Sequence, residues 1–251
     1  MQSHHKYLCV VTAISVAAVV TMASLRNQDN QASRNSSNDR QIQKPDEDEW
    51  PIAAYENPEP VDERQRALRE ARGKRYDKSF FGVKGTVKST HENIMVVLTE
   101  DWEEGIPPLP VSLSSAIVIG TVLDAKGFVS ADQTGVYSEF PTRVDEVLKT
   151  DGAAPPDSGS VITVQRSGGR VQGASARILF RISGQRMPRQ GRQYVMFLQR
   201  QDAGQDYKLI TGYELHEGKV YPLDNLNKFA SYAGRDKATF IQALRDAIMQ
   251  P

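Results

Sequence analysis

Cysteine is almost absent from the 251-residue chain, and its single copy, Cys9, lies within an N-terminal apolar run. The remainder of the chain can therefore hold no disulfide, no thiolate nucleophile and no cysteine-liganded metal. Histidine is also scarce, and of its four copies only His91 and His216 follow the N-terminal region. Net charge is missing too, because 31 Lys and Arg balance 31 Asp and Glu. A neutral chain has no overall field that attracts polyanions, so bulk electrostatics gives no sign of nucleic-acid or membrane-surface binding.

An uncharged apolar segment extends from Tyr7 to Leu25, between Lys6 and Arg26. It has the length of a long signal-peptide core or of a short membrane span, which needs about 20 apolar residues. Residues 1–25 are therefore expected to be either a cleaved signal peptide or a single-pass N-terminal anchor. A buried core helix is not expected, because the polar tract that follows offers no apolar partner for it to pack against. Both alternatives predict export, with Lys6 on the cytoplasmic side and the rest membrane-anchored, secreted or periplasmic.

Residues 26–60 contain few apolar side chains and predict a disordered polar and acidic linker. Residues 61–76 predict a basic helix, with Asp62 as the N-cap and Gly73 as a stop signal. The basic side chains of this helix could contact anionic lipid headgroups. Alternatively, they could pair with the acidic linker as part of an ordinary surface helix.

Residues 77–114 are expected to form an irregular arm with a short strand at Ile94–Leu98. Four acidic residues surround Trp102, but they lack the ligand spacing of a calcium loop. We expect a solvated turn in which the tryptophan docks onto the folded domain.

Residues 115–225 contain six or seven short strand-like segments without intervening helices, which is typical of an antiparallel barrel. Gly120 interrupts the first segment and predicts a bulge or bend, and Pro141 places the second at an edge or a bulge. Residues 226–251 predict a C-terminal amphipathic helix, capped by Asp236 and packed on the barrel. The expected fold class is mainly β: a small antiparallel barrel, closed or partly open, with flanking N-terminal and C-terminal helices.

The segments SSAIVIGTVLDAKGFVSADQTGVYSEFPTRVDEVLK, ILFRI, GRQYVMFLQR and YKLITG resemble those of an uncharacterised group of bacterial exported proteins with a small β-barrel. In that group a helix ending in ARGKRYD precedes a GIPPLP segment, and the resemblance covers roughly Leu68 to the C-terminus. The group carries no established activity, so the resemblance implies no functional residue.

More distantly, the barrel resembles the OB-like netrin and tissue-inhibitor class, which implies an OB-like barrel. Inhibitors of that class chelate a protease metal through an N-terminal cysteine, which this chain lacks, so their mechanism does not carry over. An OB fold would also place a helix where SGGRVQGASA, from Ser167, predicts a glycine-rich loop.

Acidic residues are absent between Asp157 and Asp202, although this stretch contains eight arginines and no lysine. The arginines are Arg166, Arg170, Arg177, Arg181, Arg186, Arg189, Arg192 and Arg200. Strand alternation puts Arg177 and Arg181 on one outward face, and a planar guanidinium suits carboxylate and phosphate recognition. Arg177, Arg181, Arg166 and Arg170 are therefore candidates for an anionic-ligand site.

The competing hypothesis is internal ion pairing with acids such as Glu139, Asp145 and Glu146 across the sheet. If the arginines do bind a ligand, it could be an acidic protein, a cell-wall polymer or lipid headgroups. An exported address argues against single-strand nucleic acid as the ligand, and its binding would need outward-facing Tyr194 and Phe197 as stacking platforms.

The sequence shows no nucleophile–base pair, no cofactor loop and no metal-ligand spacing. It therefore predicts a non-catalytic binding or scaffolding module of the cell envelope, without cofactor or metal. The expected partner is an envelope protein or an anionic polymer, with membrane contact through the N-terminal segment if it is uncleaved. The alternative is an envelope hydrolase that uses His91 or His216 beside a serine and a carboxylate.

Overall fold

The computed structural model describes residues 50–54, 62–77, 84–89, 93–99, 102–152, 155–172, 176–201 and 206–250. The predicted signal or anchor with Lys6 and Arg26, most of the predicted linker, and His91 lie outside these residues. Within the described ranges, no helix combines the length and the apolar character that crossing a membrane requires.

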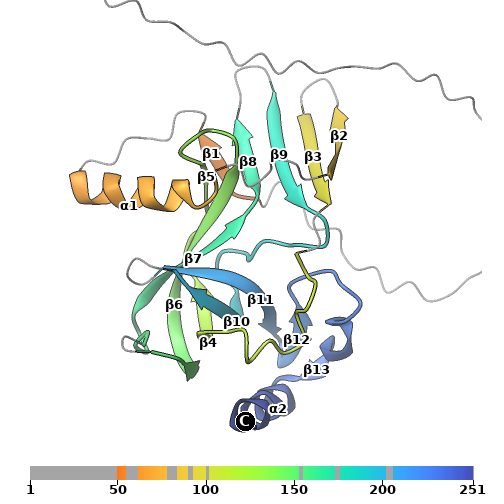
Figure 1. Ribbon diagram of the computed structural model, residues 1–251. Coiled ribbons are helices and arrows are strands. Elements are labelled where there is room, and N and C mark those ends of the chain that lie inside the picture. Colours follow the sequence, from red (N-terminus) through yellow and green to blue (C-terminus); the bar gives the residue numbers. More distant parts are fainter. Residues whose placement is uncertain are drawn as a thin grey trace, which may run out of the picture. The chain divides into compact units, whose positions relative to one another are not determined.

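The described chain is mainly β, with one helix before most of the strands and one at the C-terminal end (Figure 1). In chain order the elements are β1 (Ile52–Ala54), α1 (Glu63–Lys74), β2 (Lys84–Ser89), β3 (Asn93–Thr99), β4 (Ala116–Val122), β5 (Lys126–Val129), β6 (Val136–Thr150), β7 (Val161–Ser167), β8 (Gly169–Gln172), β9 (Arg177–Ile182), β10 (Gln193–Arg200), β11 (Asp206–His216), β12 (Lys219–Pro222), the 3-10 helix η2 (Ala230–Tyr232), β13 (Arg235–Asp236) and α2 (Lys237–Met249).

Five strands of the larger sheet close into an OB-like barrel in the order β10-β4-β6-β7-β11, with β11 pairing back to β10. Four of the five pairings are antiparallel, and β7 and β11 are parallel, with Asp206 opposite Thr163. A closed ring with an odd number of strands cannot alternate in direction throughout, so one parallel pair is unavoidable. The predicted small barrel is confirmed, with this one exception to its antiparallel pairing.

A second sheet, in the order β1-β8-β9-β3-β2, was not predicted. The sequence placed β9 in the barrel and a glycine-rich loop where β8 lies, and both predictions are wrong. The β8–β9 hairpin instead leaves the barrel after β7, at Gly168 and Gly169, whose φ angles are 98° and 149°. Glycine adopts these angles readily, and a Cβ on Gly168 would lie 3.0 Å from the carbonyl oxygen of Phe180. The two glycines therefore allow the chain to change sheets.

The bulge predicted at Gly120 is found where β4 meets β6, whereas Pro141, predicted at an edge or a bulge, lies in regular pairing with Thr163 of β7. The register between β4 and β6 shifts between Ile119 and Gly120, which confirms the predicted bulge. Pro141 lies inside β6, between Glu139, where the pairing with β5 ends, and Thr142, where the pairing with β4 begins. At that changeover the missing N–H of proline costs little.

The apolar residues of the barrel form two main buried clusters. Inward-facing side chains such as Val118, Phe140 and Met196 fill the barrel interior. The second cluster lies between the barrel and α2, where Phe240 and Leu244 are buried. The N-cap of α2 is Asp236, as predicted, and its Oδ1 accepts a hydrogen bond from the Thr239 amide at 2.9 Å. The predicted packing of this helix on the barrel is therefore confirmed.

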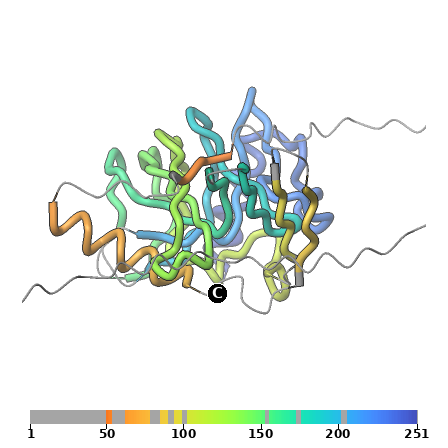
Figure 2. The backbone as a smooth tube through the Cα atoms, turned by 90° about the horizontal axis from the view of Figure 1, so that it is seen from above, coloured from red at the N-terminus to blue at the C-terminus, as the bar shows by residue number. Residues whose placement is uncertain are grey.

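Helix α1 meets the barrel only near its C-terminal end, and its N-terminal part extends away (Figure 2). Asp62 caps the helix as predicted, since its Oδ1 accepts from the Gln65 amide at 2.7 Å. Gly73 does not stop the helix, which continues to Lys74. Gly73 is buried, and a Cβ there would lie 3.1 Å from the Ala131 nitrogen, so this glycine allows close approach to the barrel.

Candidate functional site

The four arginines predicted to bind an anion do not form one exposed surface. Arg166 on β7 and Arg170 on β8 are buried, with relative exposures of 2% and 6%. Arg177 and Arg181 both lie on β9, where Arg177 is exposed and Arg181 is half-buried. Only the β9 pair is therefore open to a ligand from solution.

Arg166 has a structural role. Its Nη2 donates to Oδ2 of Asp224 at 2.7 Å, and its Nη1 donates to the carbonyl oxygen of Arg186 at 2.6 Å. Asp224 also accepts from Thr211 Oγ1 at 2.8 Å and from the Arg186 amide at 3.0 Å. Because both partners are buried and bonded, the charge of Arg166 is used inside the protein.

Trp102 docks onto the folded domain as predicted. Its Nε1 donates to the carbonyl oxygen of Ser183 at 2.9 Å, and its ring packs against the cluster under α2. The neighbouring Glu103 pairs with Lys228 at 3.2 Å. In the part of the chain that the structure describes, no group of acidic or histidine side chains has the arrangement of a metal site.

The acids proposed as alternative partners of the β9 arginines are engaged elsewhere, each by a different arginine. The pairs are Glu139 with Arg72 at 3.0 Å, Asp145 with Arg143 at 3.0 Å, and Glu146 with Arg245 at 2.8 Å. The cross-sheet ion pairs expected from the sequence are therefore not the ones that form.

The second sheet carries positive charge without negative charge. Its five strands include basic residues on β2, β8 and β9, and no aspartate or glutamate. The strand register puts Lys88, Arg177 and Arg181 on the same face of the sheet. Lys88 pairs with Met95, and Met95 pairs with Leu179. On β9, Leu179 lies two positions from each arginine and therefore points to the same side as both. This basic face, defined by Lys88, Arg177 and Arg181, is the surface that the arginine run creates.

Arg186 extends the basic face into the loop after β9. Its side chain is half-buried, and its Nε is buried without a hydrogen-bond partner among the described residues. Burial lowers the pKa of Arg186, as does the positive charge of Arg181, while Asp224 opposes both effects. The two guanidinium groups are thus near enough to repel each other. Strand alternation could not single out Arg186, because the residue lies in a loop.

The remaining arginines of the run have partners of their own. Arg189 and Arg192 both approach Glu214, at 3.3 and 3.8 Å. Arg200 donates to the hydroxyl of Tyr207 at 3.2 Å. Within the described ranges, no hydrogen bond or ion pair joins the side chains of Arg177, Arg181 or Arg186 to another residue.

His216 does not lie in the surroundings that the hydrolase alternative needs. Its side chain is 44% exposed; Nδ1 lies 3.1 Å from Nη1 of Arg192, and Nε2 lies 3.7 Å from Glu217. These neighbours supply no serine, and His91 lies outside the described residues. Tyr194 and Phe197 are buried, so neither is available as a stacking platform for nucleic acid.

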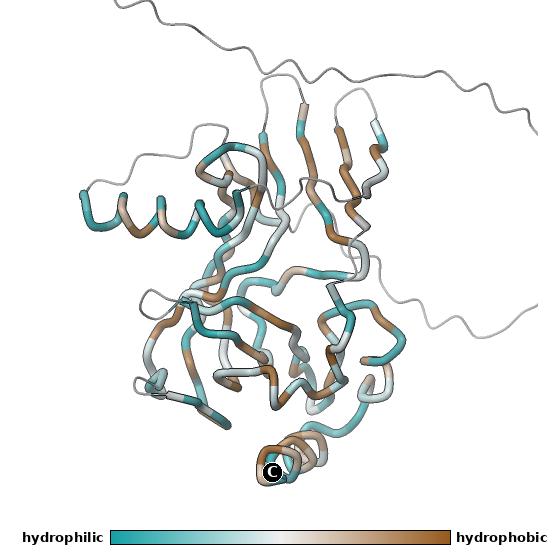
Figure 3. Tube along the Cα trace, viewed as in Figure 1, coloured by the Kyte–Doolittle hydropathy of each residue, from teal (hydrophilic) through white to brown (hydrophobic). Residues whose placement is uncertain are grey.

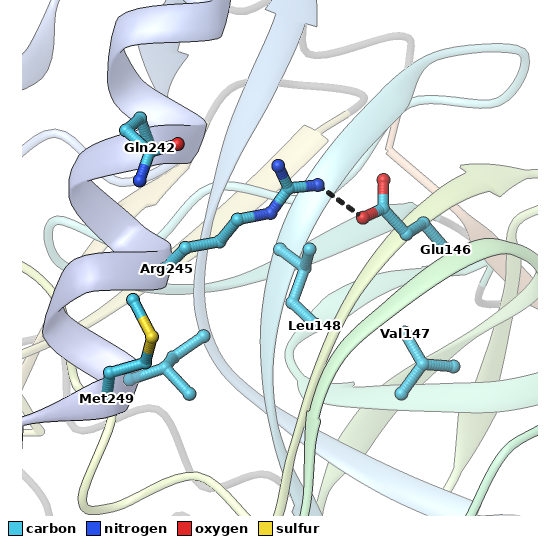
Figure 4. Close-up of a pocket in the computed structure, with 7 residues that line it drawn as sticks. Glu146, Val147, Leu148, Gln242, Arg245 and Met249 are labelled. Carbon is cyan, nitrogen blue, oxygen red and sulfur yellow. Dashed lines mark hydrogen bonds and ion pairs between the residues drawn. The ribbon is translucent and has the colours of Figure 1, made fainter.

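A shallow pocket of about 290 Å³ lies between α2 and the end of β6 (Figure 4). It is lined mainly by aliphatic side chains, including Leu148 and Met249, and the Arg245 guanidinium crosses it toward Glu146. The pocket lies where the C-terminal helix packs on β6. The Arg245 and Glu146 side chains that border it neutralise each other, so they leave no net charge for a ligand.

Comparison with known proteins adds no family to these observations. No protein-family model matches the chain, and no curated protein matches it.

Proposed function

We propose that the protein is a non-catalytic binding module of the cell envelope and that its ligand is an anionic polymer. The observation that carries the proposal is the basic face, together with Arg186. The side chains of Arg177, Arg181 and Arg186 form no ion pair in the described chain, and burial together with the positive charge of Arg181 lowers the pKa of Arg186 against the opposing charge of Asp224. A bound carboxylate or phosphate would relieve this repulsion and supply the missing acceptors.

The spacing of the arginines favours a polymer over a single small anion. Arg177 and Arg181 are four residues apart on one strand, so their α-carbons are separated by about 13 Å. A ligand with charges spread along its length matches this spacing better than one phosphate or carboxylate does, and Arg181 and Arg186 are close enough for the charge of Arg181 to lower the pKa of Arg186. An extended polyanion could contact these two residues and continue along β9 to Arg177.

A linear polyphosphate serves as the probe, with inorganic phosphate as its monomer. We expect Arg181→Gln to weaken binding of both probes, and Arg177→Gln to weaken binding of the polymer only. Affinity for the polymer should fall as salt is raised, because the contacts are ionic. The control is Arg143→Gln, since Arg143 is an exposed arginine already paired with Asp145. Equal affinity of all four proteins would refute the proposed site.

The envelope location rests on the sequence alone, on the apolar segment between Lys6 and Arg26. We propose that the barrel faces the extracytoplasmic side, either anchored or released. Cell fractionation tests this point separately from ligand binding. Recovery of the intact protein in the cytosol would contradict the location and leave the anion site to be judged on its own.

A further inference from the structure

The guanidinium of Arg72, in the last turn of α1, lies between two acidic side chains of the barrel. Its Nε and Nη2 donate to the two carboxylate oxygens of Asp206 at 2.8 and 2.7 Å, and its Nη1 donates to Glu139 at 3.0 Å. The Asp206 and Glu139 side chains are only 4% and 10% exposed. We call Glu139, Asp206 and the adjacent Thr163 and Gln165 the Arg72 site.

The Arg72 site belongs to the barrel, since Glu139 comes from β6, Thr163 and Gln165 from β7, and Asp206 from β11. Two buried carboxylates at one place are costly without a cation. Gln165 is fully buried below α1, and its Nε2 has no hydrogen-bond partner among the described residues. The barrel thus presents a preformed acidic site whose two carboxylates accept hydrogen bonds from a guanidinium, while the Gln165 Nε2 is a donor and takes no part in binding one.

The contacts beside Arg72 come from the C-terminal half of the helix that supplies the cation and from the residues just after it. Of its 12 residues only Gly73 is buried, its first five are exposed, and most of its residues are hydrophilic (Figure 3). A helix of this length is marginal in water on its own. The contacts beside Arg72 are Arg69 over the Phe128 ring at 4.9 Å, Arg75 with Asp206 at 3.4 Å, and Tyr76 stacked on Tyr137 at 4.4 Å.

We propose that the Arg72 site is a binding site for an arginine side chain of a partner polypeptide, and that Arg72 fills it when no partner is bound. The exchange replaces one guanidinium with another, so the buried carboxylates stay neutralised throughout. Arginine is required over lysine, because Asp206 accepts two parallel hydrogen bonds from a planar fork that an ammonium group cannot offer. This site is separate from the basic face and has the opposite charge.

The test uses the full chain with Arg72→Ala and a labelled synthetic peptide of residues 62–77. Without Arg72 the bidentate position on Asp206 is empty, although Arg75 stays 3.4 Å from that carboxylate, so the peptide should bind the variant at least about tenfold more tightly than it binds the wild-type protein. A peptide with Arg72→Lys should bind the variant about tenfold less tightly than the natural peptide. No binding, equal affinity for both proteins or equal affinity of both peptides would overturn the proposal.

A matched control tests whether the loss of any paired arginine increases peptide binding, and a second measurement follows the opening of α1 in the wild-type protein. Arg245→Ala removes an arginine from the exposed pair with Glu146 and should bind the peptide no better than the wild type. Hydrogen exchange of the wild-type protein needs no variant. The amides of α1 should exchange at least about tenfold faster than those of β6 and β11, through local opening. If α1 exchanges only with global unfolding, α1 is not displaceable and the proposal fails.

Discussion

Arg166 and Asp224 form an ion pair in which Nη2 and Oδ2 are 2.7 Å apart and both side chains are buried. Asp224 also accepts hydrogen bonds from Thr211 and from the Arg186 amide. The pair therefore joins β7 and β11 to the loop that holds Arg186. Removal of one partner would leave a buried charge without compensation.

Asp224→Asn should therefore lower the free energy of unfolding by about 3–5 kcal/mol. Urea denaturation measures this change. Arg143→Gln, at an exposed pair with Asp145, should cost less than about 1 kcal/mol. Similar losses in the two variants would show that the Arg166–Asp224 pair is not buried in solution.

The barrel acid Glu139 predicts a pH dependence of stability. Burial raises its pKa, the positive charge of Arg72 lowers it, and Asp206 raises it again, so that the net pKa lies above the ordinary 4.5. The folded protein then binds this proton more tightly than the unfolded chain does. The contribution of Glu139 to stability is fully present below the ordinary pKa and is lost as pH rises through the raised pKa.

Glu139→Gln should abolish this loss, because glutamine resembles the protonated acid. We expect the variant to gain stability relative to the wild-type protein as pH is raised from the ordinary pKa to neutrality. Urea unfolding of both proteins across that range measures the difference. A difference that is constant, or that changes in favour of the wild type, would contradict the raised pKa.

Asp145 predicts a pH dependence of stability opposite in sign to that of Glu139, because its pKa is lowered. Burial alone would raise its pKa, but hydrogen bonds from Gln193, Thr121 and Arg143 outweigh burial and lower it. Asp145→Asn should cost about 1 kcal/mol at neutral pH. That cost should shrink as pH falls below the ordinary 3.8 and through the lowered pKa. A cost that grows on acidification would show that these hydrogen bonds do not favour the charged form.

Gly73 tests the docking of α1. In an exposed helix, glycine to alanine gains about 1 kcal/mol, but here the added Cβ would lie 3.1 Å from the Ala131 nitrogen. Gly73→Ala should therefore destabilise the protein and speed hydrogen exchange of α1. Ala67→Gly, at an exposed position of the same helix, measures propensity alone. A Gly73→Ala variant more stable than the wild type would show that α1 is not held against Ala131.

The periodic elements could be predicted from the sequence, and the elements that depend on distant contacts could not. The apolar residues of the barrel strands and of α2 recur with the periods of a strand and of a helix, and this pattern shows which side of each element is buried. The short strands β1 and β8 carry no such pattern, and β1 is defined by its pairing with Arg170–Gln172, far along the chain. Their place in the second sheet was therefore invisible to sequence reasoning.

The candidate sites show the same division. Strand alternation identified Arg177 and Arg181 as outward-facing residues. It could not show that Arg166 and Arg170 are buried, because their burial depends on how the two sheets pack in the folded chain. Arg72 is one of several basic residues of α1, and its acceptor Asp206 lies 134 positions away. Only the folded chain brings the two together.

The most direct test of the anion site is NMR of the arginine Nε–H groups during titration with pyrophosphate. Arg186 is half-buried and its Nε has no hydrogen-bond partner among the described residues, so its Nε–H signal should respond when an anion binds beside the guanidinium. We expect saturable shifts of the Arg181 and Arg186 signals, with none for Arg143. Unchanged signals of Arg181 and Arg186, or shifts of equal size at all three arginines, would contradict the anion site.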